Sequence, residues 1–213
     1  MKAKWTKTII LFTVLILSLL LTSCNSMVTP EIPFGTEENI SKLEELDYVC
    51  LDVPFEKYAG TNWCLPASTA MEFNYFGTDI SQEKIASVII EEGKSSVYKM
   101  VKFAKDLGFD AEYVYMSTDE IKEMLRQSIP VIAVQNYALS LPYSHARVII
   151  GYDDKNQEII SNDPTAGENY RIPYSNFEAL NTCINQTLCK VIVVSKKEFS
   201  TKNIMAENNV SNS

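Results

Sequence analysis

Histidine is nearly absent from this chain of 213 residues, which contains only His145. No two cysteines have the C-x-x-C spacing. Because structural zinc sites are built from clusters of cysteine and histidine, these absences exclude a metal cage of that kind. The phosphate-binding pattern G-x-x-x-x-G-K-[ST] is also missing, so the sequence carries no ATP-driven transporter module. We expect neither a metal nor another cofactor.

Positive charge is also scarce. The chain has 19 Lys and Arg against 27 Asp and Glu, which gives a formal net charge of −8. An acidic surface repels the phosphates of nucleic acids and the headgroups of anionic lipids. The charge therefore argues against nucleic acid as a partner, although it says little about the fold.

The first two dozen residues have the pattern of an export signal. Lys2, Lys4 and Lys7 precede an apolar run over residues 9–21, and Leu-Thr-Ser-Cys ends at Cys24. This ending resembles the lipobox of bacterial lipoproteins, in which the cysteine is acylated and becomes the new N-terminus. The resemblance implies a protein anchored by lipid on the extracytoplasmic face of a bacterial membrane. The alternative is an uncleaved membrane anchor, for which the run is short.

The rest of the chain has the size of one domain. We expect a signal peptide over residues 1–23, a polar tether over 24–46 that ends in a short helix, a folded domain over 47–198 and a disordered tail over 199–213. Removal of residues 1–23 takes away three lysines and no acid, which moves the formal net charge from −8 to −11.

Helical patterns fill the first half of this domain and strand patterns the second. The predicted helices span residues 64–76, 81–93, 96–108 and 117–130, the last opened by the capping-box pattern Ser117-x-x-Glu120. The predicted strands span 131–134, 146–152, 158–161 and 190–195, with a turn at 153–156. Helices followed by an antiparallel sheet indicate the α+β class.

Four cysteines besides Cys24 lie in a compartment that permits disulfides. Cys183 and Cys189 are close enough in sequence to close a short loop, so a disulfide between them is a possibility that spacing alone does not decide. Cys50 precedes an apolar stretch and is expected to be a buried small residue. Cys64 starts a predicted helix, before Pro66 at a position where proline suits the first turn.

A nucleophilic cysteine needs a lowered pKa, a base and a donor for the developing oxyanion. The start of a helix favours the thiolate of Cys64. The only available base is His145, and imidazole needs an acceptor to fix its tautomer. Asp163 follows the second strand of the predicted hairpin, which brings it to the same end of the sheet as His145. A buried structural thiol and a turn-forming aspartate are the alternative interpretations.

The sequence resembles the papain-like cysteine peptidases that process bacteriocins with double-glycine leaders. Residues 62–68 (NWCLPAS) and 74–77 (NYFG) are similar to their nucleophile helix, and residues 129–132 (IPVI) to the strand before the histidine. Residues 144–153 (SHARVIIGYD) are similar to their histidine strand, and 162–164 (NDP) to their Asp-Pro turn. The resemblance covers roughly residues 50–195 and keeps the order Cys, His, Asp. It implies a papain-like fold with Cys64 as nucleophile, His145 as base and acid, and Asp163 orienting His145.

Two positions depart from the family pattern. Leu65 follows the cysteine where the family has glycine, which narrows the expected site. Tyr58 stands six residues before Cys64, where the family has the glutamine that donates to the oxyanion. Loss of one such donor costs about 10²–10³ in rate. The Tyr58 hydroxyl and the Asn62 amide are alternative replacements, beside the backbone N–H of Cys64.

Three classes of function follow. The first is a membrane-anchored extracytoplasmic cysteine peptidase, or related thiol acyl transferase, that acts on a peptide or protein substrate. The second is a papain-like lipoprotein that binds peptides but has lost turnover, which the missing glutamine favours. The third, a purely structural lipoprotein, leaves the order of Cys64, His145 and Asp163 to coincidence. The sequence makes no prediction of oligomeric state.

The N-terminal pattern generates the first testable prediction. Mass spectrometry of the mature protein should find residues 1–23 missing and Cys24 acylated, because the lipobox cysteine becomes the N-terminus. Cys24→Ser should release the protein from membranes or leave it unprocessed. An intact Met1 on the wild-type protein would contradict this interpretation.

Overall fold

A computed structural model describes residues 47–196 of the chain. The predicted signal peptide, the tether with its short helix, Cys24 and the whole of the predicted tail lie outside these residues. The helices are α3 (Cys64–Tyr75), α4 (Gln82–Ile89), α5 (Val97–Asp106), α6 (Thr118–Arg126) and α7 (Tyr174–Ala179). The strands are β1 (Tyr48–Cys50), β2 (Ile90–Glu91), β3 (Lys94–Ser95), β4 (Asp110–Ser117), β5 (Val131–Ala138), β6 (Leu141–Asp153), β7 (Glu158–Asp163), β8 (Gly167–Pro173) and β9 (Leu188–Ser195).

Within the described residues, seven strands form one antiparallel sheet in the order β4-β9-β5-β6-β7-β8, with β1 paired to the end of β6. β6 is the longest strand and connects the sheet, because it pairs with β5, β7 and β1 in turn. The β2–β3 hairpin is separate from this sheet. The mixed α+β class predicted from the sequence is confirmed.

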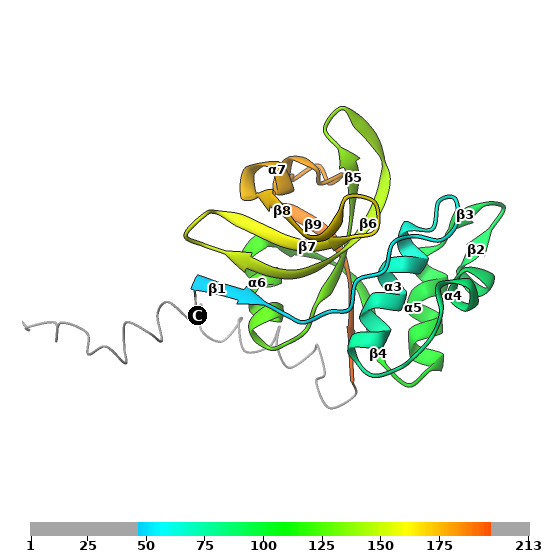
Figure 1. Cartoon of the computed structure of the whole chain (residues 1–213). Coiled ribbons are helices and arrows are strands. Elements are labelled where there is room, and N and C mark those ends of the chain that lie inside the picture. The colour runs from blue at the N-terminus through cyan, green and yellow to red at the C-terminus, as the bar shows by residue number, and fades with distance from the viewer. Residues whose placement is uncertain (1–46, 197–213) are drawn as a thin grey trace, which may run out of the picture. The chain divides into compact units, whose positions relative to one another are not determined.

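Helices cover both faces of the sheet. On one face α3, α4 and α5 pack as a group, with the β2–β3 hairpin beside them (Figure 1). Ile132, Val148 and Ile192 point toward this group. On the other face α6 and α7 pack against the alternate residues, such as Val131 and Val193. Because both faces are buried, β5 and β9 read as continuous apolar runs rather than as alternating patterns.

The α3 helix is almost wholly buried, which explains its weak amphipathic pattern. Every residue from Leu65 to Phe73 is buried, and Ala67 and Ala70 are completely inaccessible. Small side chains at these two positions allow the helix to lie close to the sheet. This packing fixes the position of the helix start, where Cys64 lies.

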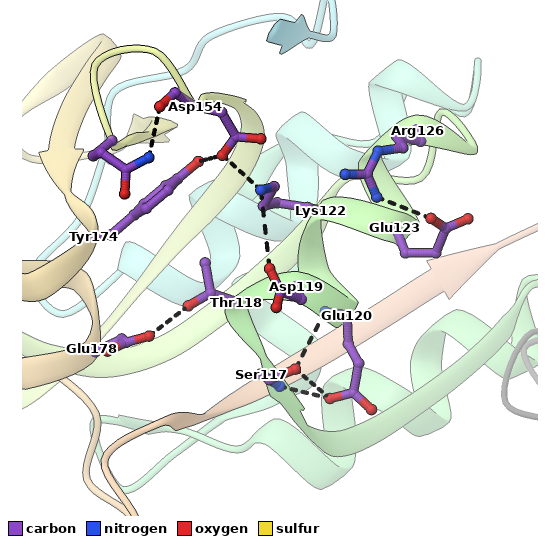
Figure 2. Close-up of polar contacts among 11 residues, drawn as sticks. Ser117, Thr118, Asp119, Glu120, Lys122, Glu123, Arg126, Asp154, Tyr174 and Glu178 are labelled. Carbon is purple, nitrogen blue, oxygen red and sulfur yellow. Dashed lines mark hydrogen bonds and ion pairs between the residues drawn. The ribbon is translucent and has the colours of Figure 1, made fainter. Parts of the chain in front are cut away.

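Figure 2 shows how α6 is held on the opposite face. The predicted capping box is confirmed: Glu120 N–H donates to Ser117 Oγ at 3.3 Å, and Ser117 N–H donates to Glu120 Oε2 at 2.7 Å. Lys122 Nζ lies 2.6 Å from Asp154 Oδ1, which also accepts from the Tyr174 hydroxyl at 2.6 Å. These contacts join α6 to the β6–β7 turn and to the start of α7.

Several parts of the fold differ from the sequence prediction, which included none of β1, β8 and α7. The predicted helix over residues 81–93 ends at Ile89, because Glu92 and Gly93 take positive φ values of 50° and 76° and turn the chain into the β2–β3 hairpin. The strand β4 was not predicted; it lies among the helices in sequence and pairs with β9 at the edge of the sheet. The order of helices first and strands second is therefore wrong at β4.

Gly151 generates a prediction about stability. A Cβ at this position would collide with the backbone carbonyl of Val49 in β1. Gly151→Ala should destabilise the protein by about 1–3 kcal/mol, the usual cost of overpacking, and lower Tm by several degrees. It should also speed hydrogen exchange of the Leu51 N–H, which donates to Ile150 O at 2.8 Å.

Gly77→Ala is the control for this measurement. Gly77 has φ 82° but open space around its Cβ position, so the substitution brings backbone strain without a collision. It should lower Tm without changing exchange at Leu51. Unchanged exchange at Leu51 in Gly151→Ala would contradict the close approach of β1 to β6.

Candidate active site

A tight turn presents Cys64 at the start of α3. Trp63 N–H donates to Gly60 O at 3.2 Å, and Asn62 takes a positive φ of 64°. A Cβ at Gly60 would collide with the Trp63 ring, so any other residue there would displace that ring. Trp63 is the N-cap residue of α3 and makes no side-chain cap hydrogen bond. The first N–H groups of the helix therefore remain available near the Cys64 thiol.

His145 and Asp163 come together across the β6–β7 ladder. β6 begins at Leu141, so His145 lies inside the strand rather than at its mouth as expected. The register pairs Val148 with Asn162, so that one position further along Asp163 lies across from Arg147, and His145, two residues before Arg147, is its diagonal neighbour on the same face. His145 Nε2 lies 3.0 Å from each Asp163 carboxylate oxygen. This contact leaves Nδ1 to make the hydrogen bond between His145 and Cys64.

The Asp163 carboxylate is held from several sides in a site that is 1% exposed. Its Oδ1 accepts from the backbone N–H groups of Thr165 at 2.8 Å and Ala166 at 3.0 Å. Arg147 Nε lies 3.1 Å from Oδ2 as an ion pair without hydrogen-bond alignment. A buried charge persists only when it is paired and hydrogen-bonded, and this carboxylate is both.

These contacts favour a thiolate at Cys64. Burial acts to raise the pKa of the thiol, but it is outweighed by the hydrogen bond and charge of His145, with the N–H groups of Ala146 and Leu65 contributing. The net pKa of Cys64 lies below its ordinary value. A thiolate is the nucleophilic form of cysteine.

The same contacts favour an imidazolium at His145. Burial acts to lower the pKa of His145, but hydrogen bonds with Asp163 and Cys64 raise it, so the net pKa lies above its ordinary value. The pKa of Asp163 lies below its usual range: burial alone would raise it, and the contacts with His145 and Arg147 outweigh burial. Cys64 and His145 can therefore carry opposite charges at the same pH.

A cleft of about 550 Å³ opens over this group, between the start of α3, the β2–β3 hairpin and β6. Tyr58 and Asn62, the two candidate oxyanion donors, both line it. Tyr58 N–H donates to Pro164 O at 3.4 Å, which ties the segment before Cys64 to the Asp163 turn. The other lining side chains are divided about evenly between apolar or aromatic groups and polar groups: Trp63, Leu65, Val97, Val134 and Tyr143, and Thr61, Lys94, Ser95, Ser144 and Thr165.

The two residues that flank Cys64 contribute differently to the cleft. From the sequence, Trp63 is either a wall of a binding subsite or a core residue, with the core favoured; in the structure it is half-buried and lines the cleft. Leu65 lines the cleft but is only 4% exposed, because its side chain packs in the core beneath α3. Leu65 therefore contributes more to packing than to narrowing the opening.

Sequence reasoning missed two neighbours of the histidine. The Tyr137 ring meets His145 edge-on, with centroids 5.1 Å apart, and stacks on Tyr143 at the same distance. Arg147 is a buried cation behind Asp163. The sequence does contain a signal for Arg147, because it is a charged residue within the apolar run of residues 146–150. An arginine that is buried in such a run needs a buried anion as its partner.

The other cysteines lie outside this group. Cys183 and Cys189 are free thiols, so the possible disulfide is not formed in the structure; Cys189 is 1% exposed and packs in the core on the α6 side. The expectation that Cys50 is buried is wrong, because β1 is an exposed three-residue strand there. Among residues 47–196, no cluster of His, Cys, Asp or Glu could hold a metal ion, and no helix has the length and hydropathy to cross a membrane.

Comparisons with known proteins bear on the family and the fold. Residues 50–187 match the sequence profile of the Peptidase_C39 like family. Solved structures of similar fold include a C39-like peptidase from Bacillus anthracis (TM-score 0.55, 19% identity, covering 70% of this chain and 98% of that one). The peptidase domain of Streptococcus ComA, a bifunctional ABC transporter of a quorum-sensing pathway, also has a similar fold. Its TM-score is 0.54 at 19% identity, and the match covers 67% of this chain and 97% of that one.

A third similar structure is a double-glycine-motif protease from an AMS/PCAT transporter in complex with its leader peptide (TM-score 0.52, 20% identity, covering 69% of this chain and 95% of that one). At these identities the likeness establishes the fold. No curated protein matches the chain.

The lowered pKa of Cys64 generates a prediction about reactivity. Iodoacetamide should label Cys64 with a pH midpoint below the value of about 8.5 typical of free cysteine. Labelling of the full chain across pH, with each thiol followed by peptide mapping, measures this midpoint. His145→Ala should move it upward, because burial would then act on the thiol without its main opposing contact.

The exposed Cys50 thiol serves as the internal comparison, and Cys64→Ala identifies the labelled peptide. A Cys64 midpoint equal to that of an ordinary thiol, or unchanged by His145→Ala, would contradict the thiolate–imidazolium pair.

Proposed function

Because the chain belongs to the Peptidase_C39 like family, we propose that it is a cysteine peptidase in which Cys64, His145 and Asp163 act together on a peptide bond. One observation carries the proposal: the hydrogen-bonded series from the Cys64 thiol through His145 to the buried Asp163 carboxylate, at the floor of an open cleft. A cysteine activated by a base that is itself oriented by a third group is the arrangement that nucleophilic catalysis requires.

The first half of the reaction forms an acyl-enzyme. The Cys64 thiolate attacks the carbonyl carbon of the substrate, and the C=O electron pair moves to the oxygen. As that oxyanion collapses, the C–N bond breaks and His145 gives its Nδ1 proton to the leaving amine. Asp163 holds Nε2–H throughout, which keeps Nδ1 directed at the reacting atoms.

The second half returns the enzyme to its starting state. His145, now neutral, takes a proton from water at Nδ1, and the resulting hydroxide attacks the thioester carbon. The C–S bond breaks, the acid product leaves and Cys64 is again a thiolate beside an imidazolium. Each proton passes through the one histidine of the chain.

The oxyanion site is where this chain departs from its family. The backbone N–H of Cys64, at the start of α3, is one donor. Tyr58 and Asn62 line the cleft beside it, and we propose that one of them replaces the family glutamine in an irregular way. The same departure favours the second candidate function, a peptide-binding lipoprotein without turnover.

We propose a peptide or protein as the substrate. A cleft of about 550 Å³ that is lined by aromatic and apolar side chains and by polar groups suits a short stretch of extended peptide. The double-glycine-motif protease with which this chain shares its fold binds a leader peptide. We further propose that the protein works on the extracytoplasmic side of a bacterial membrane, held there by lipid on Cys24; the support for this is the N-terminal sequence pattern.

The missing glutamine generates a prediction about turnover. The wild-type protein should hydrolyse generic peptides slowly although Cys64 alkylates readily, because alkylation needs no oxyanion donor. Tyr58→Gln should raise kcat by about tenfold or more, as recovery of part of the 10²–10³ that one donor supplies. Steady-state hydrolysis of a fluorogenic peptide library measures this, with Cys64→Ala as the inactive control.

Asn62→Gly separates the two candidate donors, because glycine keeps the positive φ of position 62 while it removes the amide. A large loss of kcat in Asn62→Gly would assign the donor to Asn62. Rapid wild-type turnover together with a neutral Tyr58→Gln would show that the interpretation of position 58 is wrong. Absence of turnover in both wild type and Tyr58→Gln, with Cys64 still reactive, would support the binding function instead.

A further inference from the structure

Arg147 is a buried cation for which the reaction described above has no use. Its residue exposure is 2%, and it extends from β6 two positions after His145. Because residues two apart on a strand point to the same face, both side chains lie on the side of Asp163. Burying a guanidinium is costly unless its charge and its N–H groups are matched.

Backbone carbonyls hold the guanidinium in place. The β5–β6 ladder is irregular between Asn136 and Ala138, which leaves the Tyr137 carbonyl outside the regular pairing. Arg147 Nη2 donates to Tyr137 O at 3.0 Å and reaches Asn136 O at 3.5 Å. With Nε beside Asp163 at 3.1 Å, the arginine joins the β5–β6 hairpin to the carboxylate under the histidine.

The Asp163 carboxylate therefore lies between two cations, His145 and Arg147. The other titratable groups that face this pair are Cys64 on α3, Tyr137 on β5, Tyr170 on β8 and Cys189 on β9. Burial raises the pKa of the Cys189 thiol well above its ordinary value, which keeps it neutral. Among these groups Asp163 is the one carboxylate, so its charge is shared between the imidazolium and the guanidinium.

This sharing matters because a general acid works best when its pKa is close to the working pH. A buried aspartate in contact with histidine alone would hold the imidazolium proton tightly. Arg147 repels that proton and acts to lower the pKa of His145 against the effect of Asp163. Solvent does not screen the repulsion, since all three side chains are buried.

We propose that Arg147 is a positioning residue of the active site, which shares the Asp163 carboxylate with His145 so that the imidazolium can release its proton to a leaving amine. The proposal rests on the proposed peptidase function. It assigns a role to the charge of Arg147 as well as to its packing, and the two can be separated by substitution.

The experiment is an NMR titration of the imidazole C–H signals in the full, untagged chain, where His145 is the only histidine and needs no assignment. Arg147→Gln removes the charge but keeps an amide donor for the Tyr137 carbonyl. The His145 midpoint should rise by about one pH unit, because a neighbouring like charge has been lost. Arg147→Met makes the same charge change with an apolar side chain, so that two uncharged variants are available if one does not fold.

Arg147→Lys keeps the charge and should leave the midpoint within a few tenths of a pH unit of wild type. Arg171→Met is the matched control. Arg171 is also paired with carboxylates, but it lies on β8 and its partners, Asp153 and Glu158, lie on either side of the β6–β7 turn. The His145 midpoint in Arg171→Met should equal that in wild type. Circular dichroism establishes that each variant is folded.

An unchanged His145 midpoint in a folded Arg147→Gln or Arg147→Met variant would overturn the proposal, as would an Arg147→Lys shift as large as that of the uncharged variants. The alkylation of wild-type Cys64 tests the proposed function separately. An ordinary thiol at position 64 overturns the peptidase assignment whatever the titration shows, whereas a reactive Cys64 with an unchanged midpoint overturns only the role of Arg147.

Discussion

The buried charge of Asp163 is the constraint around which the site is organised. The carboxylate is 1% exposed, so the fold must supply every partner that water would otherwise provide. It does so with two backbone N–H groups, an imidazole and a guanidinium. The α3 helix contains a carboxyl in the opposite condition. Glu72 is fully buried and has no ion-pair partner among residues 47–196, and burial raises its pKa well above the ordinary value.

Asp163 keeps its charge because two cations lie beside it. β6 presents His145 and Arg147 on the same face, two residues apart. β5 pairs with β6 at both positions, His145 opposite Gln135 and Arg147 opposite Ala133, and both side chains are buried. Because β6 is long enough to pair with three strands and also to carry both cations beside Asp163, the pairing of the sheet and the charges of the site depend on the same strand. A change in the conformation of the β5–β6 hairpin would move Arg147, which donates to Tyr137 O, and would therefore alter the ion pair between Arg147 and Asp163.

Local signals predicted the parts of the fold that depend on local chemistry. The capping box at Ser117, the turn after Asp153 and the helix start at Cys64 each follow from a few adjacent residues, and each is present. The edge strand β4 was missed because its only sheet partner, β9, lies more than 70 residues away in sequence. Arg147 was missed for a related reason. Its partner Asp163 becomes a neighbour only once the β6–β7 register is set. A strand predicted from its apolar residues gives no role to a single charged residue within it.

Activation of the cysteine and stabilisation of the oxyanion depend on separate parts of this structure. The thiolate owes its stability to His145 and to N–H groups of α3 and β6, all of which are held by the core. Of the proposed oxyanion donors, the Cys64 N–H belongs to the start of α3, whereas Tyr58 and Asn62 lie in the segment before that helix. The Tyr58 residue is 39% exposed and His145 is 4% exposed, so the core constrains the side chain at position 58 less than it constrains His145. A substitution at position 58 is therefore expected to alter the oxyanion site without disturbing the thiolate, so that a chain can keep its Cys, His and Asp group while its oxyanion site departs from the family pattern.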